Sequence, residues 1–198
     1  MHALKHGPRG AAVLLTLLSV AAFADTPAGA TRFSSDPAKS SLEFAFAQAG
    51  AQNKGKFTKF PVTLEASGGG TTPTRLEVTV DMTTFDSGDK ERDDTLRGPD
   101  LFDVKKFTQA HFVATQIART ASGFDAFGKL TIRNVTRDQH VPFTLRTATE
   151  QGHAVAYIAG RTTLHRLDFG VGQGEWKSTE WVGNDVTVSY SVRLVAAQ

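Results

Sequence analysis

Hydrophobic and polar residues alternate along most of the chain beyond residue 40, which is the period of a β-strand with one buried face. The cleanest run spans 186–194, where an apolar residue occupies every second position. Similar runs predict strands over 42–46, 62–66, 76–82, 111–115, 127–132, 141–145, 154–158 and 167–171. Most are joined by short polar turns, so we expect neighbouring strands to pair antiparallel. Such a series predicts an all-β sandwich or barrel, and closing a barrel removes exposed strand edges.

One stretch breaks this alternation and predicts a short helical cap over one end of the barrel. Residues 86–97 are highly charged and show no period of two. Ser87 or Asp89 can cap the start of a helix, and Gly98-Pro99 ends it. The apolar residues of 101–104 follow and are expected to anchor the cap.

The N-terminal residues 1–24 are typical of a secretory signal peptide. Lys5 and Arg9 make a positive start, 11–22 is an apolar run of twelve residues, and Ala22-Phe23-Ala24 supplies the small residues that a signal peptidase reads. The run is too short for a membrane-spanning helix, which needs about twenty apolar residues. We therefore expect cleavage after Ala24, a periplasmic protein, and a single domain over residues 25–198.

The charge balance argues against a nucleic-acid partner. The whole chain carries 22 basic and 20 acidic residues, and Lys5 and Arg9 account for the difference of two. Residues 25–198 are therefore formally neutral, which is not the footprint of a protein that binds phosphate backbones. The chain has no cysteine, which excludes disulfides, thiolate metal sites and a cysteine nucleophile.

The remaining candidates for chemistry are weak, and we predict neither catalytic residues nor a metal site. A Gly-x-Ser-x-Gly elbow is absent from the sequence. The histidines beyond the signal, at positions 111, 140, 153 and 165, match no metal-binding spacing. The acidic residues of 86–103 do not follow the calcium-loop pattern, and interleaved basic residues suggest mutual pairing on a solvated helix.

The phenylalanines are the most informative single residue type, because several occupy strand positions that face one way. Such rings either fill a core or line a barrel interior that holds one small apolar ligand. Two tryptophans near strand ends are candidates for the mouth, where an indole N–H can reach a polar head group. The predicted ligand-binding residues are Leu42, Phe44, Phe46, Phe57, Phe143, Phe169, Trp176 and Trp181.

An ordered set of short strings resembles one known family. The strings are GKFTKF at 55–60, RDDTL at 92–96, DLFDV at 100–104, GKLTIRNVT at 128–136, LHRLDFGVG at 164–172 and GEW at 174–176. Together, over roughly residues 32–196, they resemble the YceI-like family of secreted lipid-binding proteins. The resemblance implies a lipocalin-like eight-stranded antiparallel β-barrel with a helical excursion. It implies an elongated amphiphile inside, a polyisoprenoid, quinone-like lipid or fatty-acid derivative, and no catalytic residue or required cofactor.

The sequence departs from the family where a histidine often stands, since Gln48-Ala49-Gly50 occupies that place. This variant resembles the branch associated with di-haem b-type membrane cytochromes. The first hypothesis is therefore a periplasmic carrier or sensor of a lipid. The alternatives are an accessory protein that docks a membrane b-type cytochrome in quinone-linked electron transfer, and an enzyme. We expect a monomer or homodimer.

Overall fold

The computed structural model describes residues 29–197, so the predicted signal peptide lies outside the described residues. These described residues form eleven strands and one α-helix, with short 3-10 turns at 37–39, 68–70, 82–84, 166–169 and 174–177. In chain order the elements are β1 (Thr31–Ser35), β2 (Ser41–Gln48), β3 (Ala51–Phe57), β4 (Val62–Ser67), β5 (Thr72–Asp81), β6 (Phe85–Asp86), α1 (Lys90–Arg97), β7 (Gln109–Arg119), β8 (Phe124–Ile132), β9 (Val135–Glu150), β10 (His153–His165) and β11 (Val182–Ala196).

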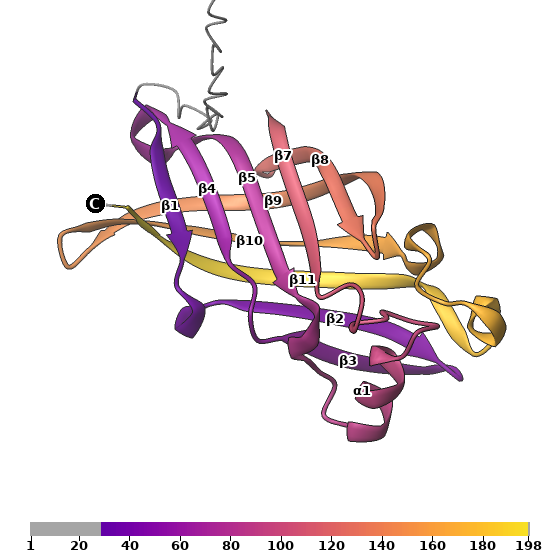
Figure 1. Ribbon diagram of the computed structural model, residues 1–198. Coiled ribbons are helices and arrows are strands. Elements are labelled where there is room, and N and C mark those ends of the chain that lie inside the picture. Colours follow the sequence, from indigo (N-terminus) through magenta and orange to yellow (C-terminus); the bar gives the residue numbers. More distant parts are fainter. Residues whose placement is uncertain (1–28, 198) are drawn as a thin grey trace, which may run out of the picture.

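Eight strands form a closed hydrogen-bonded ring in the order β1-β4-β5-β7-β8-β9-β10-β11, and β1 closes it by pairing with both β4 and β11. Every pair of neighbours is antiparallel. In Figure 1 the strands β1, β4, β5, β7 and β8 run across the direction of β9, β10 and β11. The predicted lipocalin-like antiparallel barrel is thereby confirmed.

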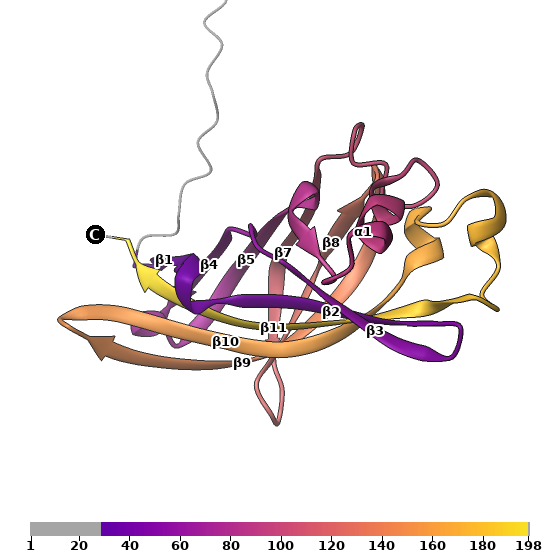
Figure 2. The same ribbon diagram turned by 90° about the horizontal axis from the view of Figure 1, so that it is seen from below.

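β11 is long enough to pair with two strands, β1 and β2, along the same edge. Its last residues pair with β1, whereas its stretch from Val182 to Ser191 pairs with β2. The sheet therefore continues beyond the ring as β2-β3-β6. Figures 1 and 2 both show the β2–β3 hairpin, α1 and the segment between β10 and β11 gathered at one end of the barrel.

The predicted helix is present with the expected caps. The Asp89 carboxylate accepts a hydrogen bond from the Arg92 backbone N–H at 3.0 Å, and Gly98 follows the last helical residue. An acidic N-cap satisfies one of the backbone donors left open at a helix start. Among residues 29–197 no helix is long and apolar enough to cross a membrane.

The strand predicted over 167–171 is wrong. Residues Arg166–Phe169 form a 3-10 turn, and Gly170 ends it with a φ of 69°, a left-handed conformation that glycine adopts readily. Phe169 and Val171 are buried because they pack with Leu101 of the capping segment, not because they share a strand face. The alternation of apolar and polar residues over 167–171 therefore arose from packing against the capping segment and not from a strand.

One end of the barrel is filled by a close-packed core. Its members come from the inward faces of nearly every ring strand, and most are less than 8% exposed. They include Phe33, Leu64, Ala66, Leu76, Ala114, Phe124, Ala126, Phe143, Ala156, Ile158, Val192 and Leu194. A chain without disulfides depends on such a core for its stability, because hydrophobic burial is the dominant favourable term in folding.

The wall between β9 and β10 is only partly made of backbone hydrogen bonds. β9 pairs with β10 from Thr144 to Glu150, but its earlier residues pair with β8 alone. Tyr190 of β11 lies opposite Gly160 of β10 and donates a hydrogen bond to the Pro142 carbonyl of β9. The aromatic side chain of Tyr190 therefore passes over β10 at Gly160, where that strand has no side chain. Burial, with a smaller contribution from Asp125, raises the pKa of the Tyr190 hydroxyl, which keeps it a donor.

This bridge predicts that Gly160→Ala destabilises the protein. A Cβ at position 160 would overlap both the Pro142 carbonyl and the Tyr190 hydroxyl. We expect a loss of about 1–3 kcal/mol in the free energy of unfolding, as for other overpacked sites. Gly183→Ala is the control, since its Cβ would meet Ala47 at an ordinary 3.5 Å. Urea denaturation of both variants is the measurement, and equal stabilities would contradict the bridge.

Candidate functional site

The end of the barrel opposite the filled core contains a partly open cavity of about 450 Å³. Its walls are apolar residues on the inward faces of the strands. They are Leu42, Phe44 and Phe46 of β2, Phe57 of β3, Val78 and Val80 of β5, Phe112 of β7, Leu130 and Ile132 of β8, Val141 of β9, Leu164 of β10, and Val186 and Val188 of β11. A volume of this size and lining suits a small apolar ligand.

Two loop segments and α1 form the roof of this cavity. Leu96 of α1 and Phe102 line it from the first segment, and Phe169 and Trp176 line it from the second. The segments are joined by backbone hydrogen bonds, because the Asp100 carbonyl accepts from the N–H of residues 172 and 173 at 3.0 and 2.7 Å. The roof is therefore one connected structure although its parts lie about 70 residues apart in the chain.

Arg166 holds the second roof segment in place. Its side chain is buried, and all five of its N–H donors reach backbone carbonyls. Nε donates to Gly183 at 2.9 Å, while the two Nη atoms donate to Val171, Trp176, Ser178 and Val182 at 2.8–3.1 Å. A single guanidinium thus fixes the path of residues 171–183 around itself.

The buried charge of Arg166 is solvated by these carbonyl dipoles. Burial lowers the pKa of the Arg166 guanidinium, but an arginine in a protein stays protonated. Close approach by the backbone requires a glycine at position 172, because a Cβ there would overlap the guanidinium. Gly172 also has a φ of 120°, which side chains rarely adopt.

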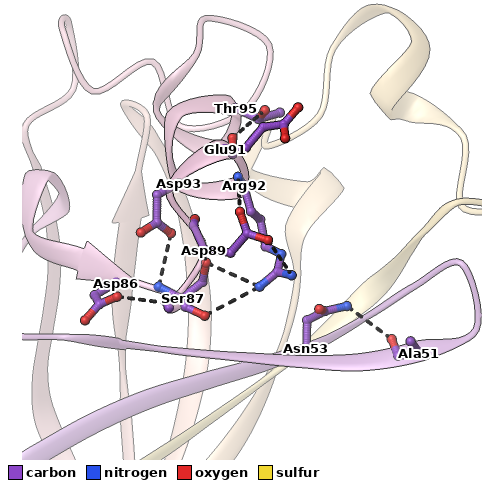
Figure 3. A network of polar contacts seen from close by, with 10 residues as sticks. Ala51, Asn53, Asp86, Ser87, Asp89, Glu91, Arg92, Asp93 and Thr95 are labelled. Carbon is purple, nitrogen blue, oxygen red and sulfur yellow. Dashed lines mark hydrogen bonds and ion pairs between the residues drawn. The ribbon is translucent and has the colours of Figure 1, made fainter.

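Charged groups enter the cavity lining from α1. Asp89, Glu91 and Arg92 are among the lining residues, together with Thr95. The Arg92 guanidinium lies 3.4 Å from both the Asp89 carboxylate and the Ser87 hydroxyl. Figure 3 shows this network above β3, with Asn53 on the strand below it. The cavity therefore combines mostly apolar walls with charged groups at the helix and with the polar side chains of Gln48, Gln139 and Thr162 on the strands.

A family model described as a YceI-like domain matches residues 33–194. The chain belongs to the YceI-like family. In structure it is similar to Burkholderia cenocepacia BcnA, with a TM-score of 0.73 and 30% identity over 80% of this chain and 98% of that one. The fold is shared with a Campylobacter jejuni YceI protein, with a TM-score of 0.65 and 18% identity over 75% and 87%.

Two further relatives complete the comparison. A Saccharophagus degradans protein described as a polyisoprenoid binding domain, implicated in plant cell wall breakdown, has a TM-score of 0.59 and 14% identity over 83% of this chain and 98% of that one. A UPF0312 protein from Yersinia pestis is 34% identical over 80 residues. That match spans 40% of this YceI-like chain and 40% of the curated relative.

Six of the eight predicted ligand-binding residues line the cavity of this YceI-like protein. They are Leu42, Phe44, Phe46, Phe57, Phe169 and Trp176. Phe143 instead lies in the filled core, 3% exposed and stacked on Phe124 with 5.5 Å between ring centroids. Trp181 is 70% exposed and is not among the lining residues. The structure thus keeps Phe143 and Trp181 off the cavity, and a ligand-binding role for the other six stays a prediction.

Several lining residues were not predicted as ligand contacts. Val78, Val80, Val186 and Val188 lie on strand faces that the alternation already identified, so the signal for them was present. The sequence gives no such signal for the lining residues of α1, because only the folded topology brings the helix to the cavity. Gln48, at the position where the family often has histidine, also lines the cavity. In residues 29–197 no three His, Asp or Glu side chains form a group that could hold a metal ion.

The role of Arg166 predicts a large loss of stability in Arg166→Met. The apolar Met side chain, which has no guanidinium, would leave five carbonyls in the roof segment without their donor, which we expect to cost about 3–5 kcal/mol of the free energy of unfolding. Arg161→Met is the matched control, because Arg161 is exposed on β10, five residues before Arg166. Urea denaturation compares the two. A roof held by other contacts would leave both variants as stable as the natural protein.

Proposed function

We propose that this YceI-like protein binds and carries an elongated apolar lipid, a polyisoprenoid, quinone-like lipid or fatty-acid derivative, without converting it chemically. The cavity in the hollow half of the barrel carries the proposal. Most of its lining side chains are apolar, and each CH₂ group transferred from water to such surroundings contributes about 0.8 kcal/mol. The description of the Saccharophagus relative as a polyisoprenoid binding domain supports the same class of ligand.

The filled half of the barrel provides stability, and the hollow half provides the binding cavity. The filled half packs ring strands against one another, while the hollow half keeps its aromatic side chains at the surface of a cavity. A folded scaffold that does not need the ligand can release it and take up another. This arrangement is what a carrier requires, and it makes the function testable by substitutions in each half.

The test compares Phe44→Ala with Phe143→Ala. Phe44 lines the cavity and Phe143 lies in the filled core. We expect Phe44→Ala to lose bound lipid while the lipid-free protein still unfolds cooperatively. Phe143→Ala should lose about 3–5 kcal/mol of stability whether or not lipid is present. Native mass spectrometry reports the retained lipid, and thermal unfolding reports the stability. If Phe44→Ala keeps its lipid, the cavity is not the binding site.

We also propose that the protein acts in the periplasm after removal of residues 1–24. The charged start, the apolar run and Ala22-Phe23-Ala24 support export and cleavage. The expected mature N-terminus is Asp25. Mass-spectrometric sequencing of the protein from a periplasmic fraction checks it, with Ala24→Arg as a variant whose cleavage should fail because position −1 requires a small residue. An intact Met1 in the periplasmic natural protein would contradict the proposal.

A further inference from the structure

The charges along the cavity indicate which lipid head group it accepts. Among the residues that line the cavity, the acidic ones are Asp89 and Glu91, and the basic ones are Arg92, Arg166 and His111. An anionic head group, such as a phosphate or carboxylate, needs a cation or a set of open N–H donors beside it. Whether this cavity offers one depends on what these basic side chains already bind.

Arg166 has no donor to spare for a ligand. Its five N–H groups are held by five backbone carbonyls at 2.8–3.1 Å, inside the roof of the cavity. Turning any of them toward an anion would leave a buried carbonyl without its partner, which costs free energy. The His111 side chain is exposed on the outer face of β7, beside the inward-facing Phe112, and its Nδ1 lies 3.2 Å from the Thr79 hydroxyl.

Arg92 is paired with the carboxylate that caps its own helix. Its guanidinium lies 3.4 Å from Asp89 Oδ2, and the other oxygen of that carboxylate accepts the Arg92 backbone N–H at 3.0 Å. The positive end of α1, which attracts anions when it is open, is therefore already occupied by a carboxylate. Glu91 adds a second negative charge in the same helical turn and also lines the cavity.

We propose that the cavity selects lipids with an uncharged polar head, such as a carbonyl, hydroxyl, ester or amide, and rejects phosphate and carboxylate heads. Glu91 and the Asp89–Arg92 pair are the specificity determinants. Gln48 and Trp176, which line the same cavity, suit a neutral head, since an amide both donates and accepts and an indole N–H donates. This inference rests on the proposed function, because it assumes that the lipid tail occupies the cavity.

The experiment uses two lipids with the same fifteen-carbon tail, farnesol and farnesyl diphosphate. Affinities are measured on the delipidated mature protein by displacement of a fluorescent apolar probe, with native mass spectrometry to confirm stoichiometry. We expect the diphosphate to bind at least about tenfold more weakly than the alcohol, because its charge meets carboxylates near a low-dielectric cavity. Equal or tighter binding of the diphosphate would overturn the inference. Failure of both lipids to bind would instead contradict the proposed function.

Charge reversal at the helix provides the second arm. Glu91→Lys should strengthen binding of farnesyl diphosphate severalfold relative to farnesol, because the charged head responds to the local potential far more than the alcohol does. Glu43→Lys is the control, since it makes the same change in net charge on the exposed outer face of β2. Glu91→Gln repeats the test with a smaller perturbation should the lysine variant fail to fold. An unchanged preference in both Glu91 variants would remove Glu91 from the specificity determinants.

Discussion

The hollow end of this barrel depends on one buried cation. Arg166 lies where β10 ends, and the five carbonyls around it belong to the chain that turns back toward β11. That segment contributes Phe169 and Trp176 to the roof and meets Asp100 of the other roof segment through backbone hydrogen bonds. Loops are poor at fixing apolar side chains over a cavity, because little of their own backbone is paired. A guanidinium with five satisfied donors gives this loop the rigidity that a strand would obtain from its neighbours.

The separation into a filled and a hollow half follows from how the strands share partners. β9 pairs with β8 alone before Thr144 and with β10 only from Thr144 onward, while β11 pairs with β2 up to Ser191 and with β1 only at its last residues. The barrel interior is therefore wider toward the capped end, and side chains that point inward from opposite walls no longer touch one another there. Where the ring is tight, Phe33, Phe143 and Leu194 close the interior. Tyr190 bridges the point of divergence through its contact with Pro142.

Much of the fold was predictable from the sequence, because period-two alternation reports which face of a strand is buried. The helix was predictable from its caps, since Asp89 and Gly98 act locally. Depth along the barrel was not predictable: Phe44 and Phe143 both face inward, and only the pairing of distant strands decides that one lines a cavity and the other fills a core. The segment after β10 was mispredicted for a similar reason, since the partners of Arg166 extend seventeen residues along the chain and leave no periodic signal.

Two arginines at the same cavity illustrate how a positive charge can be present and yet unavailable. Arg166 is surrounded by carbonyl dipoles and builds the roof, whereas Arg92 is paired with the carboxylate that also caps its helix. Both arrangements satisfy the cation with groups from the protein itself, so neither leaves the local field strongly positive. A site that recognises anions does the opposite and leaves donors open toward the ligand. Within residues 29–197 the cavity therefore has polar groups at its margin but leaves no open cationic donor for an anionic head group. Contacts between its apolar walls and the lipid tail then dominate the proposed choice of ligand.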